Sequence, residues 1–166
     1  MDYMLQRKEW EDLRAEIENI VKEHDISSAD FKALDIHEEW HQIEENIYHT
    51  FCQLNHPTVR PIWLWEYFKL ETSSCIVIPP FTILERLIDP SEEVWFFVNG
   101  SRDKFWFYQG KVKAIRKVIL ESCYIDELYL ASKKYDWLIC INHHDVLIAT
   151  GKIMAEKLRN LSDIEP

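Results

Sequence analysis

The sequence predicts an α+β fold, in which two N-terminal helices precede a mainly antiparallel sheet with inserted helices and a C-terminal helix. Three observations predict it. Apolar residues recur at helical spacing before residue 56, β-branched and aromatic residues gather in short segments after residue 61, and Pro, Gly and Asn separate those segments. We expect one domain over residues 1–166, with an acidic helical part over 1–56 and a strand-rich core over 57–166.

The first third carries two helix patterns. Apolar residues at helical spacing mark the first helix: Leu5, Trp10, Leu13, Ile17, Ile20 and Val21. After a break at residues 27–30, where a short helical turn is expected, Asp35 and Glu38 have the form of a capping box. They predict a second helix to about Leu54, whose apolar stripe is Trp40, Ile43, Ile47, Phe51 and Leu54.

The remaining chain alternates strand and helix patterns. Strands are expected over 62–70, 74–78, 93–98, 104–108, 126–131, 136–141 and 146–150. Helices are expected over 81–88, 110–122 and 152–161, and we expect helices to cover one face of the sheet.

The net charge of −10 is concentrated at one end of the chain. Residues 1–56 contain five Lys or Arg and fourteen Asp or Glu, whereas residues 57–166 contain fourteen and fifteen. Such an acidic field disfavours binding to nucleic acid and to anionic membranes and would attract a basic partner; the alternative is a solvated helical face that aids solubility. The basic side of the predicted helix at 110–122, with aromatic residues 106–108 before it, does not outweigh this charge, so nucleic-acid binding is not expected.

Localisation follows from what the sequence does not contain. No apolar run approaches the ~20 residues of a membrane span, and the chain begins in a helix pattern rather than a leader. Cys52, Cys75, Cys123 and Cys140 lack metal-site or redox spacing and are expected to be free, buried thiols in a cytoplasmic protein without a cofactor.

The run His37–Glu38–Glu39–Trp40–His41 has the spacing of a zinc-hydrolase helix, in which two histidines hold the metal and the Glu acts as general base. Its setting favours another interpretation. Trp40 belongs to the apolar stripe, so His37, His41 and the neighbouring acids should face solvent. We therefore expect an acidic docking surface containing Glu38, Glu39, Glu44 and Glu45.

The second polar cluster is Asn142–His143–His144–Asp145, between two predicted strands. Asn and Asp in a four-residue connection are typical of a hairpin turn, in which their side chains bond to nearby backbone. The alternative is a metal or acid–base site formed by His143, His144 and Asp145. We retain all four residues as a candidate binding site.

Residues 133–145 also carry a resemblance. Lys133–Cys140 followed by Asn142–Asp145, with similar strands at Val94–Phe97 and Lys104–Trp106, resembles a family of small uncharacterised bacterial cytoplasmic proteins over residues 90–151. That family implies no activity. The size, acidity and strand-rich second half are similar in architecture to immunity proteins of the SUKH type, which neutralise toxins.

The predicted function is therefore binding rather than catalysis. We expect an immunity or antitoxin protein whose acidic face masks a basic toxin. Two alternatives stay open: a metal-dependent hydrolase using His37, Glu38 and His41 or the 143–145 loop, and a domain that pairs only with a second copy of itself.

Overall fold

The computed structural model describes residues 2–35, 40–54, 63–76, 78–100 and 105–164. The helices in these ranges are α1 (Asp2–Glu23), α2 (Trp40–Phe51), α3 (Leu84–Leu87), α4 (Val112–Glu121) and α5 (Lys152–Ile164), with the 3₁₀ helices η1 (Leu64–Tyr67) and η2 (Pro80–Ile83). The strands are β1 (Phe31–Ala33), β2 (Thr72–Ile76), β3 (Glu93–Asn99), β4 (Trp106–Lys111), β5 (Glu127–Ser132), β6 (Leu138–Ile141) and β7 (Val146–Thr150).

The seven strands form one sheet in the order β1-β4-β3-β5-β6-β7-β2, and every neighbouring pair is antiparallel. Consecutive hairpins build its centre. Strand β3 pairs with both β4 and β5, and β6 and β7 follow β5 in chain order. The two strands that come first in the sequence, β1 and β2, lie at opposite edges. The predicted α+β fold with an antiparallel sheet and a C-terminal helix is confirmed.

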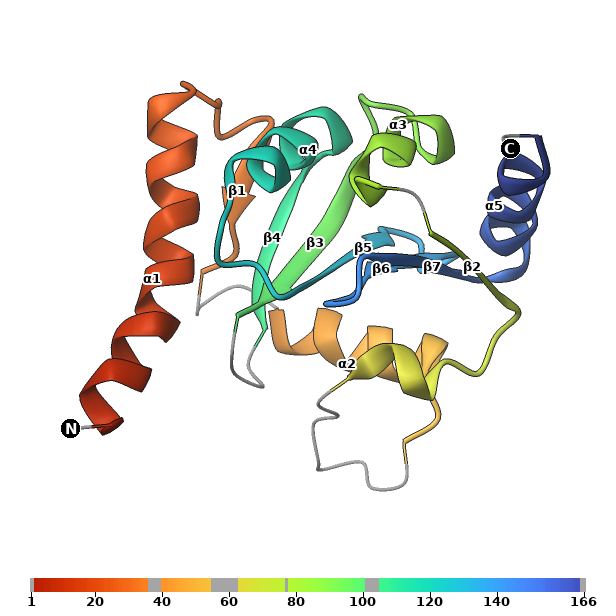
Figure 1. Cartoon of the computed structure of the whole chain (residues 1–166), viewed down its shortest axis with the longest axis horizontal. Coiled ribbons are helices and arrows are strands. Elements are labelled where there is room, and N and C mark those ends of the chain that lie inside the picture. Colours follow the sequence, from red (N-terminus) through yellow and green to blue (C-terminus); the bar gives the residue numbers. More distant parts are fainter. Residues whose placement is uncertain (1, 36–39, 55–62, 77, 101–104, 165–166) are drawn as a thin grey trace.

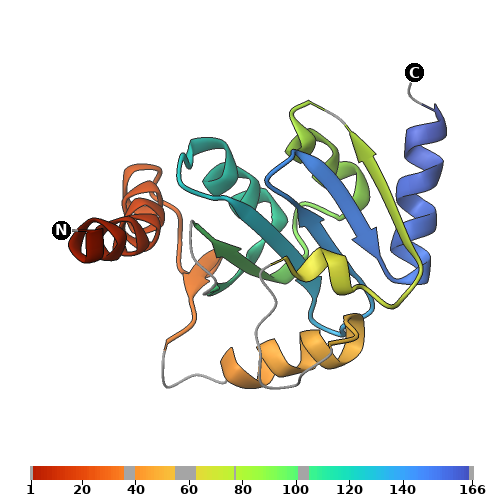
Figure 2. The ribbon, with the colours of Figure 1, turned by 60° about the horizontal axis from the view of Figure 1, so that its bottom comes forward.

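Helices cover both faces of this sheet, so the expected cover on one face only is wrong (Figures 1 and 2). One buried cluster joins α1, α3, α4 and α5 to strand residues such as Phe96 and Leu130, and the other joins α2 and η1 to Phe97 and Tyr129. Every residue of β5 and β6 is buried in consequence. Their sequences are nearly continuous apolar runs, which is the pattern of strands covered on both sides.

Two segments differ in type from their prediction. The aromatic stretch expected as a strand over 62–70 contains the 3₁₀ helix η1, which inserts the fully buried Leu64 beside α2. At the predicted break, a turn at Ser27–Asp30 is present, and the short strand β1 follows it without having been predicted. Three residues are too few to display an alternating pattern, so β1 is defined by its pairing with β4.

The cysteines are unpaired, as expected. Cys52 and Cys140 are buried and Cys75 is partly buried, but Cys123 is exposed, contrary to the prediction of buried thiols. Of the helices in the described ranges, none has the length and apolar character needed to cross a membrane.

Candidate functional site

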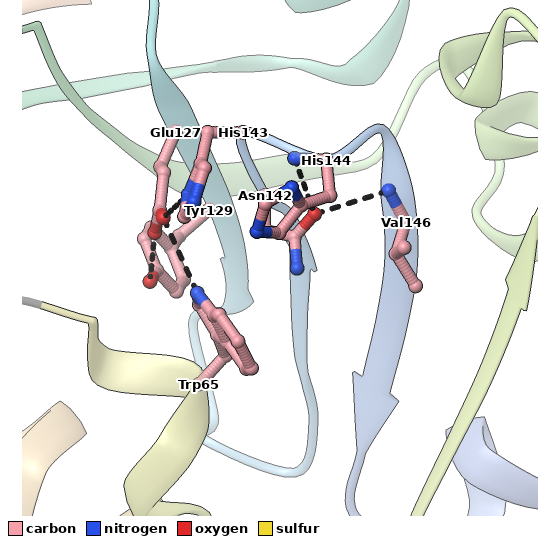
Figure 3. Close-up of polar contacts among 7 residues, drawn as sticks. All are labelled: Trp65, Glu127, Tyr129, Asn142, His143, His144 and Val146. Atoms are coloured by element: carbon pink, nitrogen blue, oxygen red, sulfur yellow. Dashed lines mark hydrogen bonds and ion pairs between the residues drawn. The ribbon is translucent and has the colours of Figure 1, made fainter.

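The candidate site lies where the start of β5 meets η1 and the turn between β6 and β7 (Figure 3). At its centre is Glu127, whose side chain is only 1% exposed. Its Oε1 accepts hydrogen bonds from His143 Nδ1 at 2.7 Å and from Trp65 Nε1 at 3.2 Å, and its Oε2 accepts one from the Tyr129 hydroxyl at 3.0 Å. Burial of a carboxylate is costly without such donors, so these three bonds explain how Glu127 is accommodated.

The tight β6–β7 turn fixes the position of His143. Asn142 is buried, and its Oδ1 accepts hydrogen bonds from the backbone N–H groups of His144 (2.9 Å) and Val146 (3.1 Å). Asp145 has a φ of 59°, a left-handed conformation that Asp tolerates better than most residues. The hairpin interpretation of residues 142–145 is confirmed, and Asn142 has a structural role within it.

The two histidines differ in their surroundings. Their ring centroids are 3.9 Å apart, but His143 points to Glu127 and its side chain is 25% exposed, whereas His144 is exposed. Asp145 is also exposed. In the ranges that the structure describes, no group of three His, Cys, Asp or Glu side chains is arranged to hold a metal ion.

Two tryptophans form the outer wall of the site: Trp63, which directly precedes η1, and Trp65 within η1. The Trp63 ring stacks on His143 with centroids 5.5 Å apart and an interplanar angle of 29°, and it lies 6.5 Å from the Trp65 ring. Trp63 is 41% exposed, which is unusual for so large an apolar side chain. His143 therefore has a buried carboxylate on one side and a partly exposed indole on another.

On the buried side of Glu127 lie two uncharged groups, the Tyr129 hydroxyl and the Cys140 thiol. Burial, together with the neighbouring Cys140 and Glu127, raises the pKa of the Tyr129 hydroxyl. Burial and the charge of Glu127 raise the pKa of the Cys140 thiol. The thiolate is the nucleophilic form of cysteine, so Cys140 is an inert core residue and not a nucleophile activated by His143.

The residues of the zinc-like run are not brought to this site. His37, Glu38 and Glu39 lie outside the described residues. His41 is exposed in the first turn of α2, with its ring stacked on Trp40.

The two acids that follow on α2 face different environments. Glu45 is exposed, as expected for a docking surface. Glu44 is not: it is 5% exposed, and its carboxylate accepts a 2.7 Å hydrogen bond from the Tyr48 hydroxyl. Its expected place on the acidic surface is wrong because it lies three and seven residues before Ile47 and Phe51, on the buried stripe of the helix.

Sequence analysis missed Glu127, Trp63, Trp65 and Tyr129. Glu127 directly precedes the apolar run 128–131, but an acid at the start of a strand carries no local signal of burial, because most Asp and Glu side chains are exposed. The partners of Glu127 come from segments up to 62 residues away in the chain, and no local pattern links them.

Comparison with known proteins gives a family and no activity. Among curated proteins, none matches the chain. A model of a family of unknown function, DUF6756, matches residues 9–162. This range is wider than the segment over which the sequence resembles small uncharacterised proteins, and it includes α1 from residue 9 onward, all of α2 and the complete sheet. The chain belongs to the DUF6756 family of unknown function.

Proposed function

We propose that this protein is a bacterial cytoplasmic immunity or antitoxin protein, which binds a basic toxin and masks it. The observation that carries the proposal is the charge distribution: fourteen acids against five basic residues over 1–56, and near balance over the rest. A one-sided acidic field accelerates association with a basic protein and disfavours acidic partners.

The structure narrows the set of acids available for such contacts. Glu44 is buried, and Glu16 is used internally, since its carboxylate accepts hydrogen bonds from the backbone N–H groups of Cys123 and Tyr124. Several acids of the first third remain exposed to solvent: Glu18, Glu23, Asp25, Asp35 and Glu45. The contact surface that we propose is the outer side of α2, with Glu45, and the preceding Glu38 and Glu39.

A salt-dependent pull-down tests this proposal. The tagged protein, expressed in its own organism, should recover a basic protein at low ionic strength and release it at about 0.5 M salt, where charge interactions are screened beyond a few ångströms. A triple reversal, E38K/E39K/E45K, should abolish recovery. Glu156→Lys, on the exposed side of α5, is the matched control and should leave recovery unchanged. Recovery of no partner at low salt, or equal loss in the control, would refute the proposal.

A metal-dependent hydrolase is the second candidate, and one observation favours it. A buried carboxylate that fixes the Nδ1 side of an imidazole is the usual support for a metal-binding histidine, and Glu127 supports His143 in this way. Elemental analysis of protein prepared without chelators tests it. A stoichiometric transition metal that is lost in His144→Ala would support the His143/His144/Asp145 version, and one lost in His41→Ala would support the His37/Glu38/His41 version. Metal-free protein that is fully folded would reject both.

A further inference from the structure

We propose that Trp63, His143 and Glu127 form a binding site for a guanidinium group, supplied by an arginine side chain of the partner. The inference rests on the proposed function, because it takes the partner to be basic. It names the contact that the exposed indole and the partly exposed imidazole are suited to make, with the buried carboxylate of Glu127 behind them.

The charge of the site calls for a cation. Its three segments, residues 63–67, 126–129 and 142–145, contain four acids, Glu66, Asp126, Glu127 and Asp145, and no Lys or Arg. Three of these acids, Glu66, Asp126 and Asp145, are exposed, and Glu127 is buried. The donors that reach Glu127 from Trp65 and Tyr129 are neutral, so they satisfy its hydrogen-bonding capacity without cancelling its charge.

The orientation of His143 provides an acceptor at the surface. When the carboxylate of Glu127 accepts the bond, Nδ1 carries the proton, and in that neutral tautomer Nε2 keeps a free lone pair. In the described part of the chain Nε2 has no hydrogen-bond partner, and the side chain is 25% exposed. A guanidinium has five N–H donors and no acceptor, which complements this lone pair.

Trp63 supplies the second contact. Indole is the aromatic ring that binds cations best, and a guanidinium stacks on it through both its charge and its flat shape. The Trp63 ring is 41% exposed and lies against the imidazole, with centroids 5.5 Å apart. The exposed part of the indole and the imidazole therefore adjoin, and in this proposal the guanidinium binds where the two rings meet. A lysine ammonium lacks the planar shape that would satisfy both contacts at once.

Binding of a small cationic probe tests the site on the complete protein. In NMR titrations with N-acetyl-arginine amide, the indole N–H of Trp63 and the His143 ring signals should shift saturably, with a Kd in the millimolar range, as expected for two contacts. N-acetyl-citrulline amide has the same shape without the charge, and should bind at least tenfold more weakly. Tighter binding of N-acetyl-aspartate amide than of the arginine probe would mean that His143 is the charged group, and would overturn the proposal.

Variants assign the binding to these residues. Trp63→Leu and His143→Leu should each weaken the arginine probe at least fivefold. Tyr124→Leu is the matched control, because Tyr124 is an aromatic residue 55% exposed outside the site, and it should leave binding unchanged. His143→Leu removes a hydrogen bond from Glu127, so the NMR spectrum of this variant is used to check that it is folded. The surface variant Trp63→Leu decides the question without it. Unchanged probe binding in Trp63→Leu would refute the site.

The two proposals fail separately. A protein that binds the arginine probe and recovers no partner retains the guanidinium site and loses the proposed immunity function. A protein that recovers a basic partner through its acidic helix, but shows no saturable probe binding, retains that function and loses this site.

Discussion

Replacing Tyr129 with Phe removes one hydroxyl from the buried side of Glu127 and leaves the aromatic ring in place. The ring is fully buried and stacks on Phe97, with centroids 4.8 Å apart and an interplanar angle of 4°, and a Phe ring can occupy the same space. What is lost is the 3.0 Å hydrogen bond to Oε2 of Glu127, together with the contact between the hydroxyl and the Cys140 thiol. A hydrogen bond to a charged group contributes about 1.5–3 kcal/mol, and Oε2 has no compensating access to water at 1% exposure. We expect the free energy of unfolding to fall by about that amount.

Urea denaturation followed by fluorescence measures the loss, and Tyr108→Phe provides the comparison. Tyr108 is 3% exposed in the same sheet, but within the described chain its hydroxyl makes no hydrogen bond, so the same substitution should cost less than about 0.5 kcal/mol. A double-mutant cycle with Glu127→Gln should then show a coupling of about 1 kcal/mol between the two side chains. Equal losses in the two Tyr→Phe variants, or no coupling, would show that the hydroxyl does not support Glu127.

Three further measurements test other parts of the structure. Burial raises the pKa of Cys140, so above pH 9.0 the unfolded chain releases the thiol proton while the folded protein retains it. Above that pH the free energy of unfolding should therefore fall by about 1.4 kcal/mol per pH unit. Cys140→Ala should flatten this decline, measured as the urea midpoint at each pH. Gly151 has a φ of +102°, and an added Cβ would meet the Asp136 carbonyl oxygen at 2.5 Å, so Gly151→Ala should cost at least about 2 kcal/mol in thermal unfolding. Gly100→Ala, whose nearest neighbour would be at 3.4 Å, should cost much less; similar losses would contradict the steric argument. Ile47→Ala, at a fully buried position under the sheet, should lose about 2–5 kcal/mol by calorimetry or urea unfolding, and a loss below 1 kcal/mol would place this residue outside a rigid core.

Much of the second half of the fold is predictable because each element there is bounded by its own turn residues. The predicted segments 126–131, 136–141 and 146–150 correspond to β5, β6 and β7, and the predicted helix at 152–161 corresponds to α5. What could not be predicted is the second covering layer. An apolar run identifies a strand, but it does not say that α2 will lie on one face while α1 and α4 lie on the other.

The site shows the same division between local and long-range information. The turn at 142–145 was predictable because Asn142 acts on backbone groups two and four residues away. Glu127 and Trp65 were not, because their contact depends on where η1 packs against the sheet. Glu44 is an instructive error: its charge suggested solvent, but its position relative to Ile47 placed it in the buried stripe, where the Tyr48 hydroxyl bonds to it.

The position of the first two strands at opposite edges of the sheet has a consequence for how the chain is made. A ribosome delivers β1 and β2 early, but β1 pairs with residues 108–110 and β2 with residues 146–150. Until those late segments emerge, both early strands lack their hydrogen-bonding neighbours, and the apolar side of α2 lacks Tyr129 and Cys140 to pack against. In the acidic first third of the nascent chain, the interval between synthesis and packing against the rest of the fold is thus the longest. Like charges repel, so the excess of acidic residues in this third would oppose association between incomplete chains.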